Sequence, residues 1–418
     1  MTDTIRLTDL AAPEYTPEAQ ALLDAVAAVP VDLTLDGVLA AAREQCDVPF
    51  YEDSGLRERV QVFLSAVATD SHLSAMGRMT IAMYLQRHLV QRSRLEALYL
   101  EHPEIEAEEI EAPIIIAGLP RSGTTHLLNL ISADTRLRSL RYWESLEPIP
   151  SQATLKGDAE DERYANGLAQ LAMQDAMMPY FQNMYDVRND SIHEEIELQF
   201  LDASTLLQAN LANIPQWEDY YYGQDQTPHY EFLKRVLKAL QWLRGPRRWV
   251  LKSPQHLAFL PVLHNVFPDA TYVVTHRDPV GIFTSWVTML SYTARMSRDP
   301  VDLDEVSAQA LRIQEALLQG VTAGIHALPA EQVVQVHFDE FMKDDFGVLE
   351  QIYAKAGLSF DASTRAEIQA YSDQHQRGHL GKIQYDLEGD FGITRAELYQ
   401  RFAAYMEAFP VPREAENS

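Results

Sequence analysis

Residues 114–126 read Ile114-Ile-Ile-Ala-Gly118-Leu-Pro-Arg-Ser-Gly-Thr-Thr-His126. The first four residues form an uninterrupted apolar run, which is typical of a parallel strand buried on both faces. Two glycines follow with a spacing of five positions, and the apolar run from Leu127 to Ile131 predicts a helix directly after them. In this order of strand, loop and helix, backbone N–H groups and the helix N-terminus can hold a phosphate. The stretch therefore predicts an α/β fold with a phosphate-binding loop.

Four further short apolar runs predict partners for this strand. They span residues 139–143, 248–251, 271–275 and 333–338, and segments with helical spacing separate them. Such alternation is typical of a doubly wound α/β domain. We therefore expect an α/β fold with a P-loop-like parallel sheet of about five strands flanked by helices.

The remainder of the chain is predicted to be helical. Residues 1–110 carry apolar positions at helical spacing without an alternating strand pattern, which predicts a helical N-terminal region. The α/β domain would then span residues 111–418, with a helical cap insertion at 150–247 that is rich in Met, Tyr and acidic residues. Near the end of this domain, Thr394 and Glu397 fit a capping box at the start of a helix.

Charge and composition exclude several classes of function. The 418 residues include 34 basic and 61 acidic side chains, and the net charge of −27 repels nucleic acid and anionic membranes. A few arginines and helix N-termini can still form a local pocket for a small anion. The single cysteine, Cys46, excludes an internal disulfide and a thiolate zinc cluster. No leader-like or membrane-length apolar run is present in the sequence, so we expect a cytoplasmic protein without a membrane span.

The loop departs at one position from the ATP-binding pattern G-x-x-x-x-G-K-[S/T]. Thr124 follows Gly123 where that pattern has the lysine that holds the β- and γ-phosphates. Arg121 offers a fork of donors from within the loop, and three hydroxyls add to it, those of Ser122, Thr124 and Thr125. These predicted phosphate ligands suit a short, highly charged group better than a triphosphate.

The run from Pro120 to Thr125 resembles the 5′-phosphosulfate loop of the sulfotransferases that use 3′-phosphoadenosine-5′-phosphosulfate (PAPS), which commonly reads P-R-S-G-T-T. The family's second signature, a strand that ends in arginine with a serine eight residues later, resembles the segment from Tyr272 to Ser285, in which Arg277 is the arginine. At the end of a parallel strand and inside the next helix, Arg277 and Ser285 can hold one phosphate from two sides. The resemblance implies that this is the 3′-phosphate of PAPS.

A third segment resembles the family more weakly. It reads Arg377-Gly378-His379-Leu-Gly381-Lys382 and is similar to the late basic, glycine-containing segment with which the family covers the 3′-phosphate and the adenosine. Its glycines permit close approach of the backbone, although an ordinary surface turn is an alternative interpretation. The resemblance as a whole covers residues 112–392 and implies a sulfotransferase with PAPS as co-substrate.

Sulfuryl transfer requires positive charge at the departing phosphate oxygen. Lys252 follows a predicted buried strand in the run Val250-Leu-Lys252-Ser-Pro254, beside the expected donor site. It resembles the lysine with which tyrosylprotein-type sulfotransferases act on the leaving oxygen. Arg121 of the loop is a second candidate for this role, because its charge lies at the predicted phosphate.

For the general base the sequence leaves two candidates open. Glu144 ends the predicted strand at 139–143 and resembles the catalytic glutamate of tyrosylprotein-type sulfotransferases. His193 lies in a segment of helical spacing, could be oriented by Asp190, Glu194 or Glu197, and has an ordinary pKa near ~6.5 that suits proton abstraction. For a small-molecule acceptor His193 is slightly preferred. The segment lacks the second histidine of a zinc-binding helix, so no metal is predicted.

The predicted acceptor is a small hydrophobic alcohol or phenol. The insertion contains the run Met177 to Phe181 with Met184-Tyr185, and the run Trp217 to Tyr222, whose apolar and aromatic side chains can line a pocket. Two other functions are compatible with the sequence: a P-loop-type small-molecule kinase in which Lys252 replaces the missing lysine, and a non-catalytic nucleotide-binding interaction protein. The sequence does not decide between a monomer and a homo-oligomer.

Overall fold

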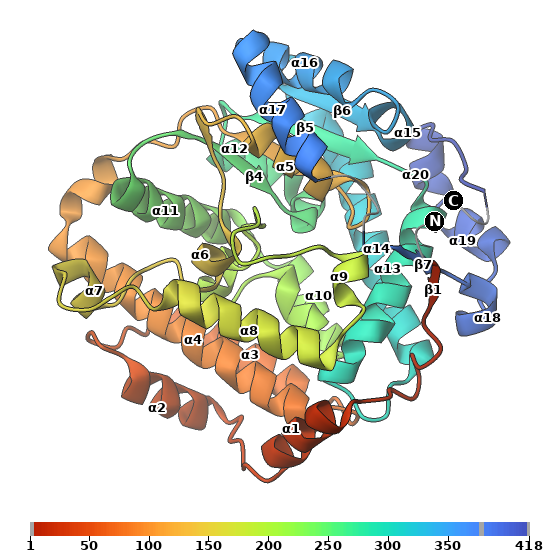
Figure 1. Cartoon of the computed structure of the whole chain (residues 1–418). Helices are drawn as coiled ribbons and strands as arrows, with labels where there is room; N and C mark the ends of the chain where they lie inside the picture. Colours follow the sequence, from red (N-terminus) through yellow and green to blue (C-terminus); the bar gives the residue numbers. More distant parts are fainter. Residues whose placement is uncertain (1–3, 376–379, 416–418) are drawn as a thin grey trace.

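The computed structural model describes residues 4–375 and 380–415, and a five-stranded parallel sheet lies at its centre (Figure 1). The strands are β2 (Ile114–Ala117), β3 (Leu137–Arg138), β4 (Arg248–Lys252), β5 (Thr271–His276) and β6 (Val333–His337). Their spatial order is β3-β4-β2-β5-β6, with Ile116 opposite Lys252 and Ala117 opposite Val274. The loop that follows β2 therefore has the end of β4 on one side and the end of β5 on the other. The predicted α/β fold with a five-stranded parallel sheet is confirmed.

Strand β2 is buried on both faces, as its uninterrupted apolar run predicts. Ile114 and Ile116 point into a core that they share with α5 (Thr124–Ser132) and α16 (Asp345–Lys355). Ile115 points into a larger core on the opposite face, which includes side chains of the insertion and of the N-terminal helices. Each of these isoleucines is fully buried and contributes roughly 1.5–3 kcal/mol of transfer free energy. The sheet is thus fixed firmly beneath the loop.

The strand predicted at residues 139–143 is wrong. The edge strand β3 consists only of Leu137–Arg138, and α6 (Tyr142–Leu146) begins four residues later. Tyr142 and Leu146 are both buried and stand one helical turn apart, so the helix places both side chains on its inward face. Between the two elements, Arg141 forms an isolated antiparallel bridge with Ile192.

The N-terminal region is helical, as predicted, except for its first described residues. The helices are α1 (Pro17–Ala27), α2 (Leu35–Gln45), α3 (Ser54–Val67) and α4 (Ala75–Glu101). A hydroxyl or carboxylate side chain caps the N-terminus of each of them. Before α1, however, β1 (Thr4–Arg6) pairs in parallel with β7 (Lys382–Gln384), and Arg6 binds both carboxylate oxygens of Asp390 at 2.6 and 2.5 Å.

The insertion and the later part of the chain supply the remaining helices. Those of the insertion are α7 (Gln152–Lys156), α8 (Arg163–Met177), α9 (Phe181–Met184), η2 (Leu198–Asp202), η3 (Leu206–Asn210), α10 (Pro215–Gly223) and α11 (Thr227–Arg244). Those after it include α12 (Leu260–Val266), α13 (Pro279–Thr293), α14 (Leu303–Gly324), α15 (Phe338–Phe341), α17 (Ala362–Gln374), α18 (Leu387–Phe391), α19 (Arg395–Arg401) and α20 (Ala403–Ala408). The predicted capping box of Thr394 and Glu397 is confirmed at α19. Among the described helices, none combines the length and apolar character needed to cross a membrane.

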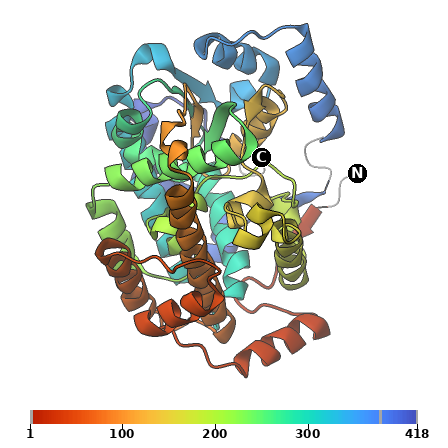
Figure 2. The same ribbon diagram turned by 90° about the vertical axis from the view of Figure 1, so that its left-hand side faces the viewer.

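The N-terminal helices and the insertion share one hydrophobic core. Figures 1 and 2 place α1–α3 at the end of the molecule opposite to α16 and α17. A buried carboxylate ties the parts together: Asp202 of η2 binds Arg59 of α3 at 2.6 Å, Arg92 of α4 at 2.7 Å and His229 of α11 at 2.5 Å. The helical region predicted as a separate N-terminal unit is therefore packed directly on the cap.

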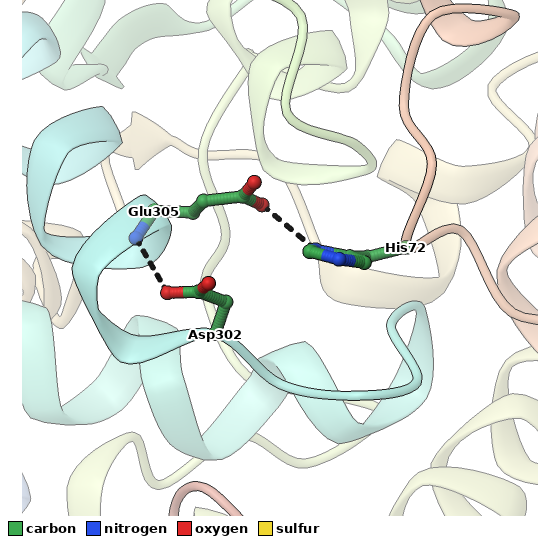
Figure 3. A group of neighbouring side chains, drawn as sticks. All are labelled: His72, Asp302 and Glu305. Atoms are coloured by element: carbon green, nitrogen blue, oxygen red, sulfur yellow. Dashed lines mark hydrogen bonds and ion pairs between the residues drawn. The ribbon is translucent and has the colours of Figure 1, made fainter.

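A second group of polar side chains, His72, Asp302 and Glu305, joins the loop before α4 to α14 (Figure 3). His72 Nδ1 lies 3.1 Å from Glu305 Oε2, and Asp302 caps α14 by accepting a hydrogen bond from the Glu305 backbone N–H at 3.1 Å. All three side chains are partly buried, and together they offer three ligand atoms suited to a cation. Since hydrogen bonds within the chain already engage each of them, we assign the group a structural role in fixing α14.

Candidate active site

The phosphate loop is folded tightly against β5. A Cβ atom at Gly118 would overlap the Thr275 hydroxyl, so only glycine fits there. Gly123 has a φ of +83° and Arg121 a φ of +67°, which turns the chain sharply into α5. Within the described residues, no side chain caps the N-terminus of α5. Its first backbone N–H groups, which carry partial positive charge, therefore suit an anion.

The hydroxyls of the loop do not all face the same way. Ser122 Oγ donates a hydrogen bond to the Leu119 carbonyl at 2.6 Å and lies 2.7 Å from Thr275 Oγ1, so this side chain, predicted as a phosphate ligand, instead stabilises the loop from within. Thr124 and Thr125, the other two predicted phosphate ligands, line the cleft above the loop. The loop thus presents two threonines and its own backbone to the cleft.

A cavity of about 480 Å³ opens at the carboxyl ends of β2 and β4. It brings together six of the predicted site residues from distant parts of the chain, namely Arg121, Gly123, Thr124, Thr125, His193 and Lys252. Such convergence at the carboxyl ends of neighbouring parallel strands is the usual position of a ligand site in an open α/β sheet.

Lys252, the last residue of β4, is almost completely buried, with 1% of its surface exposed. Its Nζ atom donates a hydrogen bond to Glu194 Oε1 and lies 3.5 Å from Thr125 Oγ1. Glu194 also lines the cleft. The sequence suggested Glu194 only as an orienting partner for His193, whereas in the structure it pairs with the lysine.

Glu195 binds the backbone of the same lysine. This residue was not identified from the sequence. Its Oε2 atom accepts a hydrogen bond from the Lys252 backbone N–H at 2.8 Å, and its Oε1 atom lies 2.5 Å from His256 Nε2. His256 Nδ1 in turn lies 2.9 Å from the Tyr230 hydroxyl. Burial favours the neutral form of Glu195, but these hydrogen bonds outweigh it and lower the pKa of this carboxyl. A fully buried carboxylate thus fixes the end of β4.

His193 lies in the wall of the cleft, outside any regular helix. Its backbone N–H donates to the Leu140 carbonyl at 2.9 Å, its Nδ1 atom lies 3.4 Å from the Tyr185 hydroxyl, and its ring packs edge-on against Tyr142. Burial, more than any neighbouring charge, lowers the pKa of His193 from its ordinary value. The imidazole is therefore neutral at pH 7, which is the form that can accept a proton.

The carboxylates suggested as partners of this histidine have other hydrogen-bond or ion-pair partners. Asp190 accepts a hydrogen bond from the Tyr164 hydroxyl at 2.7 Å, and Glu197 faces His88 at 3.5 Å. Glu194 is engaged by the lysine of β4. The Tyr185 hydroxyl, 3.4 Å from Nδ1, is the polar group in contact with the His193 ring.

Glu144, the other base candidate, is placed outside the lining of the cleft in the described structure. It lies in α6 with 1% of its surface exposed, and its Oε1 atom is 3.2 Å from Arg138 Nη2 and 2.9 Å from Arg244 Nε. Two arginines therefore neutralise this carboxylate within the protein. This geometry suits an anchor for α6 better than a group that takes a proton from an acceptor.

Arg277 and Ser285 flank the loop on the side of β5. Arg277 directly follows β5, and its Nη1 atom donates to the Arg121 carbonyl while its guanidinium lies 4.1 Å from the centre of the Phe338 ring. Ser285, on α13, accepts a hydrogen bond from Arg121 Nε at 2.9 Å. The remaining nitrogens of Arg277 bind Glu414 at 2.6 and 2.8 Å. Both predicted 3′-phosphate ligands thus adjoin Arg121.

A second cavity of about 690 Å³ adjoins the first and shares Arg121, Thr125 and His126 with it. Gly381, from the third predicted family segment, lines this second cavity. The other predicted ligands of that segment, Arg377, Gly378 and His379, lie outside the described residues.

The rest of the first cavity is mainly apolar and comes from the insertion, α13, α14 and α15. Its apolar lining includes Phe181, Val187, Ile196, Leu206, Leu207, Trp286, Met289, Ile313, Leu317 and Phe338. Of the residues in the insertion that were predicted to line an acceptor pocket, Phe181 and Tyr185 do so. Met177 and Trp217 are instead packed in the hydrophobic core, where 1% of each is exposed.

Comparison with known proteins agrees with this geometry. Residues 113–362 match the sulfotransferase family. The omega-hydroxy-beta-dihydromenaquinone-9 sulfotransferase Stf3 of Mycobacterium tuberculosis is 24% identical over 290 residues, which cover 66% of this chain and 71% of that protein.

Two solved structures are also similar to the chain. Sulfotransferase STF1 of Mycobacterium tuberculosis is 26% identical with a TM-score of 0.76, covering 88% of this chain and 98% of that one. Sulfotransferase STF9 of Mycobacterium avium is 25% identical with a TM-score of 0.79, covering 93% and 99%. These matches decide against the kinase and the non-catalytic binding protein that the sequence left open. The chain belongs to the sulfotransferase family and is a sulfotransferase related to the mycobacterial Stf proteins.

Proposed function

We propose that the enzyme transfers the sulfuryl group of PAPS to a hydroxyl of a small, hydrophobic acceptor. One observation carries the proposal: Lys252 and His193 line a single cleft directly above the phosphate loop, while Arg277 and Ser285 flank that loop on its other side. Sulfuryl transfer from a phosphosulfate to a hydroxyl requires three parts: a loop that holds the phosphate, a cation at the edge of that loop, and a neutral imidazole that can accept a proton.

The residues suit the donor in a specific way. The uncapped start of α5 and the two threonines of the loop would hold the 5′-phosphosulfate, and Arg277 with Ser285 would hold the 3′-phosphate. Lys252 would stabilise the negative charge that develops on the bridging phosphate oxygen when the sulfur–oxygen bond to it breaks. Glu194, which pairs with the Lys252 ammonium, keeps that cation at the edge of the loop.

At the acceptor, His193 would take the hydroxyl proton as the new oxygen–sulfur bond forms. Its lowered pKa keeps the ring nitrogen free of a proton at neutral pH, and the Tyr185 hydroxyl beside Nδ1 holds the ring in place. The apolar lining from α13 and α14 supports a hydrophobic alcohol or phenol as acceptor. The relative Stf3 is named for a hydroxylated dihydromenaquinone, which is consistent with an acceptor of this class.

Thermal unfolding with adenosine-3′,5′-bisphosphate (PAP) tests the donor site directly. We expect stabilisation by PAP, about 2.7 kcal/mol at one hundred times the dissociation constant, and none by ADP with magnesium, because Thr124 replaces the lysine of an ATP site. Turnover with PAPS and a panel of hydrophobic alcohols and phenols then tests the acceptor class. Stabilisation by ADP with magnesium alone would contradict the proposed donor.

A further inference from the structure

Glu414 occupies the fork of Arg277. Its Oε1 atom lies 2.6 Å from Arg277 Nε and its Oε2 atom 2.8 Å from Nη2, so the carboxylate binds two nitrogens at once. The third nitrogen, Nη1, donates to the Arg121 carbonyl. All three guanidinium nitrogens of Arg277 are therefore engaged within the chain.

The carboxylate of Glu414 also lies close to the first turn of α13. A Cβ atom added at Gly281 would lie 2.7 Å from Glu414 Oε2, which shows how closely the two segments approach. The N-terminus of α13 is itself capped, because the Asp278 side chain accepts a hydrogen bond from the Val280 backbone N–H at 2.9 Å. The fork of Arg277 therefore gives this position its affinity for an anion, and a glutamate of the chain itself fills it.

The segment that carries Glu414 is anchored to the core by the buried residues that precede it. Phe409 and Val411 are each 7% exposed, and the Phe409 ring stacks on His276, the last residue of β5. Past this anchor, the Glu414 backbone N–H donates to Asp278 Oδ2 at 2.7 Å and its carbonyl accepts from Arg395 at 2.8 Å. The backbone of Glu414 is therefore held on both sides, and its carboxylate can leave Arg277 only by rotation about the bonds of its own side chain.

We propose that Glu414 is an internal competitor of the donor's 3′-phosphate, which must displace its carboxylate from Arg277. This inference rests on the proposed function, because it takes Arg277 as a ligand of that phosphate. A carboxylate and a phosphate present similar pairs of oxygens to a guanidinium fork, so the two cannot occupy Nε and Nη2 together. A competitor tethered to the protein has a high effective concentration. It therefore weakens the binding of the donor and of the bisphosphate product alike.

The competition acts on product release, because the product bisphosphate keeps the 3′-phosphate after the sulfuryl group has left. When that phosphate loosens, Glu414 can return to Arg277 and prevent rebinding. Glu414 thereby favours release of the product over its retention.

The test compares dissociation constants of the full chain and its variants by calorimetry. PAP is one ligand and 5′-AMP, which lacks the 3′-phosphate, is the other. In Glu414→Gln we expect PAP to bind about three- to tenfold more tightly, the range of a partly buried ion pair, and 5′-AMP to bind as in the wild type. The same tightening in Glu414→Ala would tie the effect to loss of the carboxylate.

Glu407→Gln is the matched control, since it removes an exposed glutamate of the neighbouring helix α20 and should leave both constants unchanged. Equal or weaker binding of PAP to Glu414→Gln and Glu414→Ala, with native thermal unfolding, would overturn the inference while leaving the proposed function intact. If the wild type fails to bind PAP at all, the proposed donor site itself is wrong.

Discussion

Three consecutive side chains contact the site in three different ways. His193 lines its wall, Glu194 binds the Lys252 ammonium, and Glu195 binds the Lys252 backbone N–H. This is possible because residues 193–195 precede η2 and are not helical, so successive side chains diverge. Residue type identified the histidine and the lysine from sequence. The buried support of Glu195 could not be found, because its partner lies 57 positions away and no local pattern marks the contact.

The base can be identified by comparing two variants. His193→Ala should lower kcat by about 10²–10⁴, the usual contribution of a general base, with PAP binding unchanged. Glu144→Gln should keep kcat within a few-fold, because that carboxylate is paired with Arg138 and Arg244 away from the cleft. Steady-state kinetics with a fixed acceptor measures both. A normal rate in His193→Ala together with a large loss in Glu144→Gln would reverse the assignment.

The pH dependence of kcat should reflect the protonation of His193. Burial lowers the pKa of His193, so its neutral, proton-accepting form persists below the ordinary value near ~6.5 and is lost only as the pH falls through the lowered pKa. The acid limb of the kcat profile should therefore lie below pH ~6.5 in the wild type and disappear in the alanine variant.

At the scale of elements, the short buried strands were the most predictable part of the fold. Four of the five predicted strands end within one residue of the observed bounds, and three of these, β2, β4 and β5, are buried strands that read as continuous apolar runs. Three strands escaped prediction for physical reasons. β3 has only two residues, and β1 and β7 depend on each other from opposite ends of the described chain.

The loop between β2 and α5 makes a prediction at this scale. Gly118→Ala places a methyl group against the Thr275 hydroxyl, so the loop must shift away from β5. We expect PAP-induced thermal stabilisation to be lost while the circular dichroism spectrum stays native. Gly223→Ala is the control, because nothing lies within 4 Å of its Cβ position. Undiminished PAP binding by Gly118→Ala would show that the loop tolerates the shift.

At the scale of the whole molecule, the helical N-terminal region, the cap and the sheet form one packed body. Sequence periodicity identified the region as helical but could not say what it packs on, since that depends on contacts such as Arg59 with Asp202, 143 positions apart. Burial by itself would raise the pKa of Asp202, but His229 and the two arginines outweigh it and lower it. The ionised carboxylate therefore stabilises the fold above its unfolded-state pKa, and this contribution is lost as the pH falls.

Removal of this carboxylate should be costly. Asp202→Ala leaves Arg59 and Arg92 buried without their common partner, so urea unfolding at pH 7 should show a loss of about 3–5 kcal/mol. Asp36→Ala, which removes an almost fully exposed partner of Arg57, should cost less than about 1 kcal/mol. Equal, small losses in the two variants would mean that Asp202 does not join the N-terminal helices to the cap.

The pairing of β1 with β7 also sets an order of events during synthesis. Arg6 is made before its partner Asp390, which follows 384 positions later. At the usual rate of about 5–20 residues per second, a ribosome needs roughly 20 to 80 seconds to make the intervening chain. The phosphate loop and most of the sheet emerge well before this pair can close. Gly381, at the edge of the second cavity, directly precedes β7, so the nascent chain completes that cavity only after the phosphate loop and most of the sheet have been made.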